Sequence, residues 1–207
     1  MKRTRQMLQK ALMELMHEKT FQSITVQDIA ERATVNRATF YDHFVDKFAL
    51  LEYAVRDSFE EELRQKLPPD VHLSLDGLRA LIEMVCTFIQ DGHRHCNPAD
   101  AQILRLVETQ TSGLLVEVIR GWLQESRRAG VPGDTSVETT AHAVGWAIFG
   151  AARYWEEDHH HQPVAFFADD LLPLIVAGLR DTYHIDGLAD DFMQPDHSER
   201  SEHSQRI

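Results

Sequence analysis

The stretch from Thr25 to Phe44, TVQDIAERATVNRATFYDHF, contains the pattern that decides the fold. After Thr25 comes an apolar face of helical period, with residues at i, i+3, i+4 and i+7: Val26, Ile29, Ala30 and Ala33. Thr25 precedes this face, and Asp28 follows three residues later, which is a capping-box pattern. The sequence therefore predicts a helix that starts after Thr25.

The next residues predict a turn and a second helix. Thr34-Val35-Asn36 interrupts the apolar period, and Asn36 is a good N-cap for a helix from about Arg37 to Phe44. On that helix Phe40 and Phe44, four residues apart, should face the core. The remaining faces hold Arg37, Ala38, Thr39, Tyr41 and His43. A helix that only packed in a core would not need this set, so the pair of helices is interpreted as a helix-turn-helix.

This arrangement resembles the N-terminal DNA-binding domain of the tetracycline-repressor (TetR) family of transcriptional regulators. The resemblance runs from Met7 to Leu51. It comprises an apolar first helix, F-x-x-I-T-V-x-D-I-A from Phe21 to Ala30, R-A-T-F-Y-x-H-F from Arg37 to Phe44, and Asp46-Lys47. The family usually has glycine at the first turn position, where this chain has Thr34, so a left-handed backbone there would be strained. The alternative is a helical bundle that carries this pattern by coincidence.

Length and composition fit a soluble helical protein. The chain has 207 residues, of which 43% are hydrophobic, enough for one sizeable core or for a small domain joined to a larger one. It has no 18-residue apolar run, and MKRTRQ at the N-terminus lacks the apolar block of a signal peptide, so we expect a cytoplasmic protein. Cys86 and Cys96 do not form a C-x-x-C pattern, and Cys86 is expected to be buried packing.

Charge is distributed unevenly along the chain. The formal net charge is −12. Residues 1–50 hold eight Lys/Arg and six Asp/Glu, a balance of +2, so the other residues carry −14. A positive N-terminal region can approach phosphates, while the acidic remainder would be repelled by DNA and would orient the encounter.

The rest of the chain predicts an all-α protein. A first helix from about Arg5 to His17 should bury Leu8, Leu12 and Leu15 or Met16, and a helix that begins at Val45 or Asp46 should continue to Leu67, before Pro68-Pro69. Further helices are expected at Leu75–Gln90, Pro98–Thr109, Leu114–Ala129, Val137–Glu157 and Phe166–Tyr183, with a kink or restart at Pro173.

These segments suggest a division into domains. We expect an N-terminal three-helix helix-turn-helix domain (1–50), joined by a connecting helix to a larger helical ligand-binding and dimerisation domain (51–185). Residues 186–207 lack an apolar period and predict a disordered tail.

The last two long helices are apolar on more than one face, which a single core does not require. In the resembled family these two helices pack against their copies in a second subunit. The resemblance therefore implies a homodimer with a two-fold interface. The alternative is that both are ordinary core helices of a monomer.

The candidate DNA contacts follow from a helix whose N-terminal end enters a groove. Arg37 can pair with guanine or hold a phosphate, and Ala38 allows close approach to a thymine methyl. Thr25, Thr39, Tyr41, His43 and Lys47 are expected at the sugar-phosphate backbone, with Thr25 and Lys47 each at a helix start. The alternatives are solvated charges for Arg37 and Lys47 and a structural hydrogen bond for His43.

Twelve histidines raise the question of a metal site. His93, His95 and Cys96 cluster in DGHRHCNP, and His159 to His161 are consecutive in EEDHHHQP. Both groups fall in expected loops, and consecutive histidines cannot all point at one ion from a regular backbone. No metal or other cofactor is expected, although a metal-responsive module that uses His93, His95 and Cys96 is kept as an alternative.

Catalytic motifs are absent: there is no glycine-rich phosphate loop, no G-x-S-x-G and no H-E-x-x-H, so we do not expect an enzyme. The second domain has side chains that could line a small-molecule pocket: Met84, Phe88, Trp122, Trp146, Phe149 and Tyr154. The resembled family binds inducers between these helices, but each residue taken singly is more often plain core.

The combined interpretation is a ligand-responsive homodimeric repressor on a palindromic double-stranded DNA operator. The alternative is a DNA-binding or protein-interaction module with no small-molecule ligand. The operator, the regulated genes, the ligand and the direction of regulation cannot be derived from the sequence.

Overall fold

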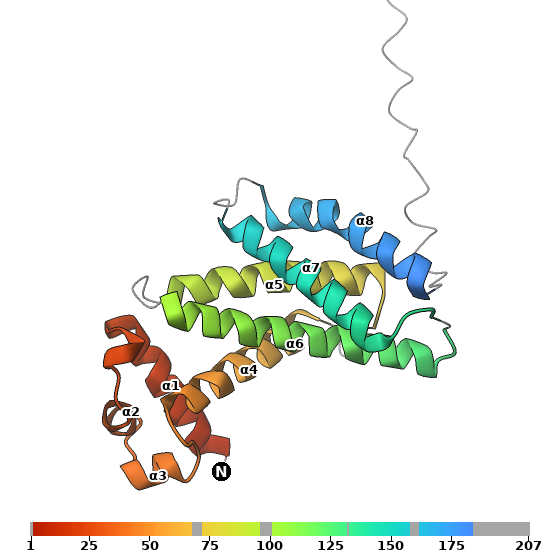
Figure 1. The fold of residues 1–207 in the computed structure, drawn as a ribbon. Coiled ribbons are helices and arrows are strands. Elements are labelled where there is room, and N and C mark those ends of the chain that lie inside the picture. Colours follow the sequence, from red (N-terminus) through yellow and green to blue (C-terminus); the bar gives the residue numbers. More distant parts are fainter. Residues whose placement is uncertain (1, 68–71, 96–100, 132, 158–161, 184–207) are drawn as a thin grey trace, which may run out of the picture.

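The computed structural model describes residues 2–67, 72–95, 101–131, 133–157 and 162–183. This part of the chain contains eight α-helices and one short 3-10 helix, with no strand, which confirms the all-α class (Figure 1). In chain order the elements are α1 (Lys2–Glu18), η1 (Phe21–Ser23), α2 (Val26–Arg32), α3 (Arg37–Tyr41), α4 (Lys47–Lys66), α5 (Leu75–His95), α6 (Ala101–Arg128), α7 (Val137–Glu157) and α8 (Val164–Tyr183).

The first three helices and the start of α4 form a small lobe at the end of α4 (Figure 1). α1 buries Leu8, Leu12, Leu15 and Met16, as the apolar spacing predicted. Phe21 and Phe40, from η1 and α3, are completely buried in the same core. The core thus holds three short elements, η1, α2 and α3, against α1 and α4. None of the three short elements could be stable alone.

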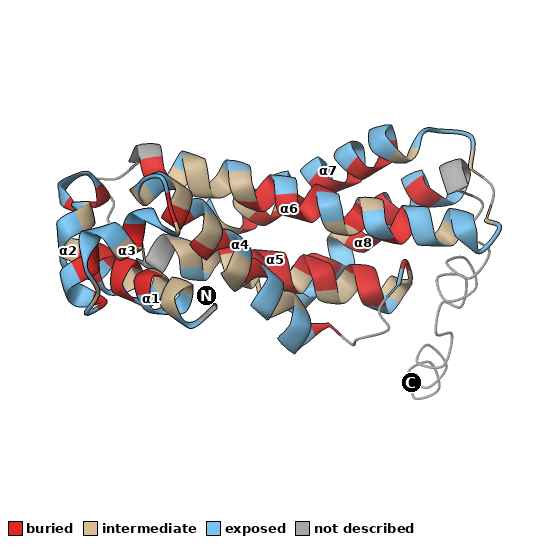
Figure 2. Ribbon diagram, turned by 90° about the horizontal axis from the view of Figure 1, so that it is seen from below, coloured by how far each residue is buried: buried red, intermediate tan, exposed pale blue. Residues whose placement is uncertain are grey.

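The longer helices α5 to α8 form a second layer, with their buried faces turned toward one another (Figure 2). Gly145 allows α6 and α7 to approach closely, since a Cβ atom there would lie 2.7 Å from Cγ2 of Val116. Trp155, near the end of α7, donates from Nε1 to the carbonyl of Gln162, 3.1 Å away, and so fixes the start of α8. The long helices therefore share a single continuous core with the N-terminal lobe.

The largest difference from the sequence-based expectation concerns α6. We expected two helices, Pro98–Thr109 and Leu114–Ala129, but one helix runs from Ala101 to Arg128. The polar run before Gly113 does not break it, because Thr111 Oγ1 donates to the carbonyl of Val107 (2.8 Å) and Ser112 Oγ donates to that of Thr109 (3.0 Å). Both hydroxyls are buried yet satisfied by their own helix.

Other boundaries differ less. α5 extends to His95 instead of ending at Gln90, α7 has the expected bounds Val137–Glu157, and α8 continues through Pro173. α4 begins after Asp46, whose Oδ1 accepts from the Ala49 amide at 2.8 Å. The expected Asn97-Pro98 helix start, the Pro68-Pro69 stop and the tail from residue 186 lie outside the described residues.

The turn between α2 and α3 has the left-handed backbone that the sequence suggested. Thr34 has φ 57°, and it is the only non-glycine residue with positive φ in the described ranges. The Val35 amide donates to the Ala30 carbonyl (2.9 Å) and the Thr34 amide donates to the Glu31 carbonyl (3.0 Å), which is a Schellman motif. The strained position is therefore fixed by the hydrogen bonds that end α2.

We expect Thr34→Gly to stabilise the protein. Removing a β-branched side chain from the left-handed region relieves about 1–2 kcal/mol, and the greater freedom of glycine in the unfolded chain offsets part of that gain. Urea unfolding should give a higher midpoint for Thr34→Gly and a lower one for the control Glu31→Gly, within regular helix. A lower midpoint for Thr34→Gly would show that the turn is not strained.

Candidate nucleic-acid interface

The short helix α3 is fixed at its N-terminal end by a side-chain cap. Oδ1 of Asn36 accepts from the Thr39 amide at 2.7 Å and from the Thr39 hydroxyl at 3.0 Å. This confirms Asn36 as the N-cap. It also uses the hydroxyl proton of Thr39, so Thr39 is not available as a hydroxyl donor to a phosphate in this state.

α3 is shorter than expected, because it ends at Tyr41 and not at Phe44. The His43 amide bonds the Phe40 carbonyl at 3.0 Å, a three-residue step that tightens the chain into a turn. Phe40 and Phe44 are nevertheless both buried, with ring centroids 6.0 Å apart. The core-facing pair expected from the spacing is therefore present.

The outward face of α3 presents Arg37, Ala38 and Tyr41, all of them exposed. The guanidinium carbon of Arg37 lies 6.0 Å from the centroid of the Tyr41 ring, a cation–π distance. Tyr41 is 51% exposed although its ring edge contacts Phe40. This face thus combines a positive charge, a small residue and a phenol on a buried support.

His43 differs from these three residues. Its side chain is half-buried, and its Nδ1 atom is buried without a hydrogen-bond partner among the described residues. A buried ring nitrogen without a partner is costly, and a hydrogen bond from an incoming group would remove that cost.

Thr25 takes part in the predicted capping box at the start of α2. Its amide and its hydroxyl both donate to Oδ2 of Asp28 at 2.7 Å, and the Asp28 amide donates to the Thr25 hydroxyl at 3.1 Å. The hydrogen bonds from Thr25, followed by the nearby Lys19, lower the pKa of Asp28 to about 2. The proton of the Thr25 hydroxyl is therefore used within the domain.

Lys47 has an internal role that the sequence analysis missed. Its Nζ donates to the carbonyls of Phe21 (2.8 Å), Gln22 (3.2 Å) and Ile24 (2.7 Å), and lies 4.7 Å from the Phe21 ring centroid. We expected a phosphate contact there; instead the ammonium group ties η1 to the start of α4. The sequence holds only a weak indication of this internal role, because a lysine at a helix start is more often solvated.

Two other basic residues of this lobe, Arg32 and Lys19, also form ion pairs within it. Arg32 forms a two-pronged pair with Glu18, with its two terminal nitrogens 2.9 and 2.7 Å from the carboxylate oxygens. Lys19 lies 2.9 Å from Asp28. Lys19, Arg32 and Lys47 thus hold α1, η1, α2 and α4 together, whereas Arg37 lies on the exposed face of α3.

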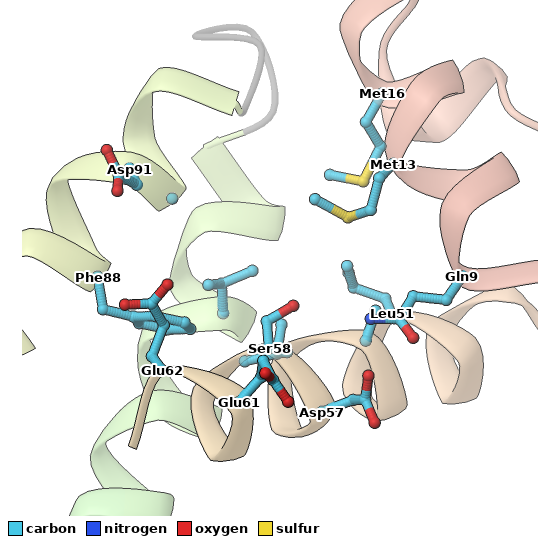
Figure 3. A pocket seen from close by; sticks show the side chains of 14 residues that line it. Gln9, Met13, Met16, Leu51, Asp57, Ser58, Glu61, Glu62, Phe88 and Asp91 are labelled. Atoms are coloured by element: carbon cyan, nitrogen blue, oxygen red, sulfur yellow. The ribbon is translucent and has the colours of Figure 1, made fainter. Parts of the chain in front are cut away.

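The six expected ligand-binding residues do not all come together, although the rings of Trp146 and Phe149 meet edge to face at 5.8 Å. Met84, Trp122 and Phe149 are buried, whereas Trp146 and Tyr154 are 54% and 65% exposed on α7. A cavity of about 430 Å³ lies elsewhere, between α1, α4, α5 and α6, and only Phe88 of the six lines it (Figure 3). Its other walls include Met13, Met16 and Leu51, which no sequence pattern had grouped.

The histidine clusters are only partly described. His93 and His95 fall on the last turn of α5 rather than in a loop, while Cys96 and His159 to His161 lie outside the described residues. Within the described ranges no three His, Cys, Asp or Glu side chains gather to hold a metal ion. Cys86 is buried as expected, and burial raises the pKa of its thiol to about 12.

None of the helices in the described ranges is long and apolar enough to cross a membrane.

Comparison with known proteins agrees with this geometry. Residues 8–54 match the model of the bacterial regulatory proteins of the tetR family. The HTH-type transcriptional regulator YxbF of Bacillus subtilis (strain 168) is 42% identical over 60 residues, which is 28% of this chain and 16% of YxbF. The match thus spans about a sixth of that relative.

Two solved structures share the fold over most of both chains. FadR of Thermus thermophilus, a TetR-family repressor in complex with lauroyl-CoA, has a TM-score of 0.55 at 24% identity, covering 84% of this chain and 94% of FadR. FadR of Bacillus subtilis in complex with stearoyl-CoA has a TM-score of 0.54 at 16% identity, covering 84% and 98%. At these identities the likeness is one of fold.

A capped, exposed α3 that follows a capping box on α2 is the geometry of a helix-turn-helix. Residues 8–54, which match the tetR family of bacterial regulatory proteins, therefore form a tetR-type helix-turn-helix region.

We expect Lys47→Met to destabilise the protein even without DNA. The methionine keeps the apolar stem but removes the ammonium donor to the carbonyl of Ile24 and one of the two donors to that of Phe21, which costs about 1–3 kcal/mol. Urea unfolding followed by circular dichroism measures the loss, with Lys10→Met, at an exposed position on α1, as the control. Equal stability of the two variants would restore Lys47 as a solvated or phosphate-binding cation.

Proposed function

We propose that the protein is a cytoplasmic, sequence-specific DNA-binding transcriptional regulator that acts as a ligand-responsive homodimeric repressor on a palindromic operator. The observation that carries this proposal is the exposed Arg37–Ala38–Tyr41 face on a helix whose opposite side is anchored by Phe40. The match of residues 8–54 to a family of regulatory proteins supports it.

The geometry of α3 suits entry into the major groove by its N-terminal end. Arg37 is the first residue of the helix and can place its guanidinium on the edge of a guanine. Ala38 beside it lets the backbone approach a thymine methyl. Tyr41, one turn later, can donate its hydroxyl to a phosphate. In this proposal α2, α3 and α4 are positioned around the groove by Thr25, Thr39 and Lys47. The His43 side chain forms a hydrogen bond with the sugar-phosphate backbone of the DNA.

We expect Arg37→Ala and Tyr41→Ala each to weaken operator binding without unfolding the protein. Loss of a guanine contact by Arg37 should cost about 1–3 kcal/mol and relax the sequence preference, whereas loss of a phosphate contact by Tyr41 should weaken all sequences similarly. Fluorescence anisotropy with a labelled operator at fixed salt measures both effects. Arg128→Ala, an exposed arginine at the end of α6, is the matched control. Operator affinities equal to that of the control would remove α3 as the reading helix.

The homodimer is supported by an apolar face on α7 and α8. Trp146 and Tyr154 of α7 are 54% and 65% exposed, and Phe166 and Leu174 of α8 are 64% and 73% exposed. Figure 2 shows the exposed residues of α7 and α8 on the outside of the bundle. Small residues lie between the large ones on α7: Ala143, Ala147 and Gly150.

Such a face fits a second copy of this chain. Large apolar side chains clustered on one surface mark an interface, and small residues between them allow two helices to pack closely. A two-fold axis would bring the same face of both subunits together, forming a four-helix interface from two copies of α7 and α8. Trp146 and Tyr154, expected from the sequence to line a ligand pocket, would then belong to the dimer interface.

We expect the double variant Trp146→Glu/Leu174→Glu to be monomeric. Two buried carboxylates per subunit would face apolar surface across the axis, which disfavours association strongly. Sedimentation equilibrium should give the mass of a monomer for this variant and of a dimer for the wild type. Gln124→Glu, exposed on α6, is the control and should remain dimeric. A wild-type monomer, or a double variant that still dimerises, would contradict this interface.

The response to a ligand would pass through α4, which packs against both the N-terminal lobe and the long helices. Arg56 of α4 forms a two-pronged pair with Glu117 of α6, with N–O distances of 2.9 and 3.2 Å. The FadR structures hold lauroyl-CoA and stearoyl-CoA. For this chain they support a small-molecule effector as a class, and the effector would act by preferring one placement of α4 relative to α6.

A further inference from the structure

The 430 Å³ cavity lies where the N-terminal lobe meets the long helices. α1 and α4 contribute one side of it, and the end of α5 and the first turns of α6 contribute the other (Figure 3). A volume of this size is typical of small-molecule sites, which form preferentially at such junctions. Any occupant would contact both parts of the protein at once.

One part of the cavity wall is apolar and adaptable. Met13 and Met16 extend from α1 toward the cavity, opposite Phe88 of α5 (Figure 3). Leu51 and Val55 of α4 and Val107 of α6 complete this part. Methionine side chains fill irregular space easily, so the wall can accommodate an alkyl chain or an aromatic body.

The rest of the lining is acidic. Asp57, Glu61 and Glu62 of α4 and Asp91 of α5 line the cavity, and no lysine or arginine is among its described lining residues. Glu61 also accepts from Gln65 at 2.8 Å and pairs with Arg64, while Glu62 Oε2 lies 2.8 Å from Nζ of Lys66. Oδ1 of Asp57 accepts a long hydrogen bond, 3.5 Å, from the Tyr53 hydroxyl. Glu61 and Glu62 are therefore already paired with neighbouring basic side chains, but every charged residue of the described lining is a carboxylate.

We propose that this cavity binds an amphiphilic organic cation, with an apolar body against Met13, Met16 and Phe88 and a protonated amine or quaternary ammonium among Asp57, Glu61 and Glu62. The inference rests on the proposed function, because it assigns the effector class of that regulator. A ligand with an anionic head group would place like charges together in partly desolvated surroundings, which disfavours binding.

The position of the cavity explains how such a ligand would act on DNA binding. A second hollow of about 420 Å³, lined by Phe48, Ile103 and Leu106 among others, lies along the same part of α6. The first turns of α6 therefore have space on more than one side. A cation that fills the first cavity holds α1 and α4 at a set distance from α5 and α6, and so selects one orientation of α3.

The test is calorimetric titration of the full-length protein at pH 7 with three compounds that share one alkyl chain: decylamine, decanol and decanoate. Decylamine is cationic and decanoate is anionic at this pH. We expect decylamine to bind most tightly, decanol more weakly and decanoate most weakly. Binding of decanoate as tight as that of decylamine, or no binding by any of the three, overturns the proposal.

Substitutions test whether these carboxylates cause the preference for decylamine. Asp57→Asn, Glu61→Gln and Glu62→Gln should each lower decylamine affinity by about two- to fivefold, and the triple variant by more than tenfold, while decanol binding stays unchanged. Glu60→Gln removes an exposed carboxylate of α4 outside the lining and should have no effect. Ser58→Phe fills the cavity and should abolish binding of both compounds, with circular dichroism confirming the fold. A triple variant with wild-type affinity for decylamine overturns the assignment.

The final arm separates this inference from the proposed function. Decylamine should lower the affinity of the wild type for its selected operator at least tenfold, with no effect on the Ser58→Phe variant. Tight decylamine binding that leaves operator affinity unchanged overturns the effector role. Failure to select any operator contradicts the proposed function instead, and the titration remains informative because it contains no DNA.

Discussion

The burial of Phe40 is the interaction on which the exposed surface of α3 depends. α3 has five residues, far too few to form a stable helix alone in water. Phe40 anchors it to the core of the N-terminal lobe, and the Asn36 cap orients its first turn. Lys47 in turn holds η1 against α4, so that Phe21 joins the same core. Arg37, Ala38 and Tyr41 can be exposed in a fixed arrangement because everything behind them is packed.

α4 packs against both the N-terminal lobe and the long helices, so in the proposed mechanism it would connect them. Its first half is buried against α1 and its second half against α5 and α6, where the rings of Phe59 and Phe88 meet edge to face at 5.2 Å. Phe88 also lines the 430 Å³ cavity, so the same side chain contacts α4 and would contact an occupant of the cavity. The Arg56–Glu117 pair is half-exposed and thus weak, which suits a joint that must adopt two arrangements.

Local chemistry made part of this structure predictable. The capping box at Thr25, the cap at Asn36, the strain at Thr34 and the inward pair Phe40 and Phe44 all follow from short-range rules, and all are present. Long-range geometry was not predictable: Lys47 reaches carbonyls more than twenty positions away, and the cavity joins four helices. The continuity of α6 was missed because a polar run before glycine resembles a break when its hydroxyls can instead bond within the helix. The DNA contacts of α3 and the domain boundaries remain predictions.

The most direct test of the account is selection of DNA from a random duplex library by the full-length protein at about 0.15 M salt, since affinities depend steeply on ionic strength. The account predicts enrichment of a two-fold symmetric sequence. Its half-sites should lie one helical turn apart, about 34 Å, or a multiple of that distance, because a symmetric dimer presents two copies of α3 to successive major grooves. Recovery of no preferred sequence, or of a single asymmetric half-site, would contradict the proposed homodimeric regulator.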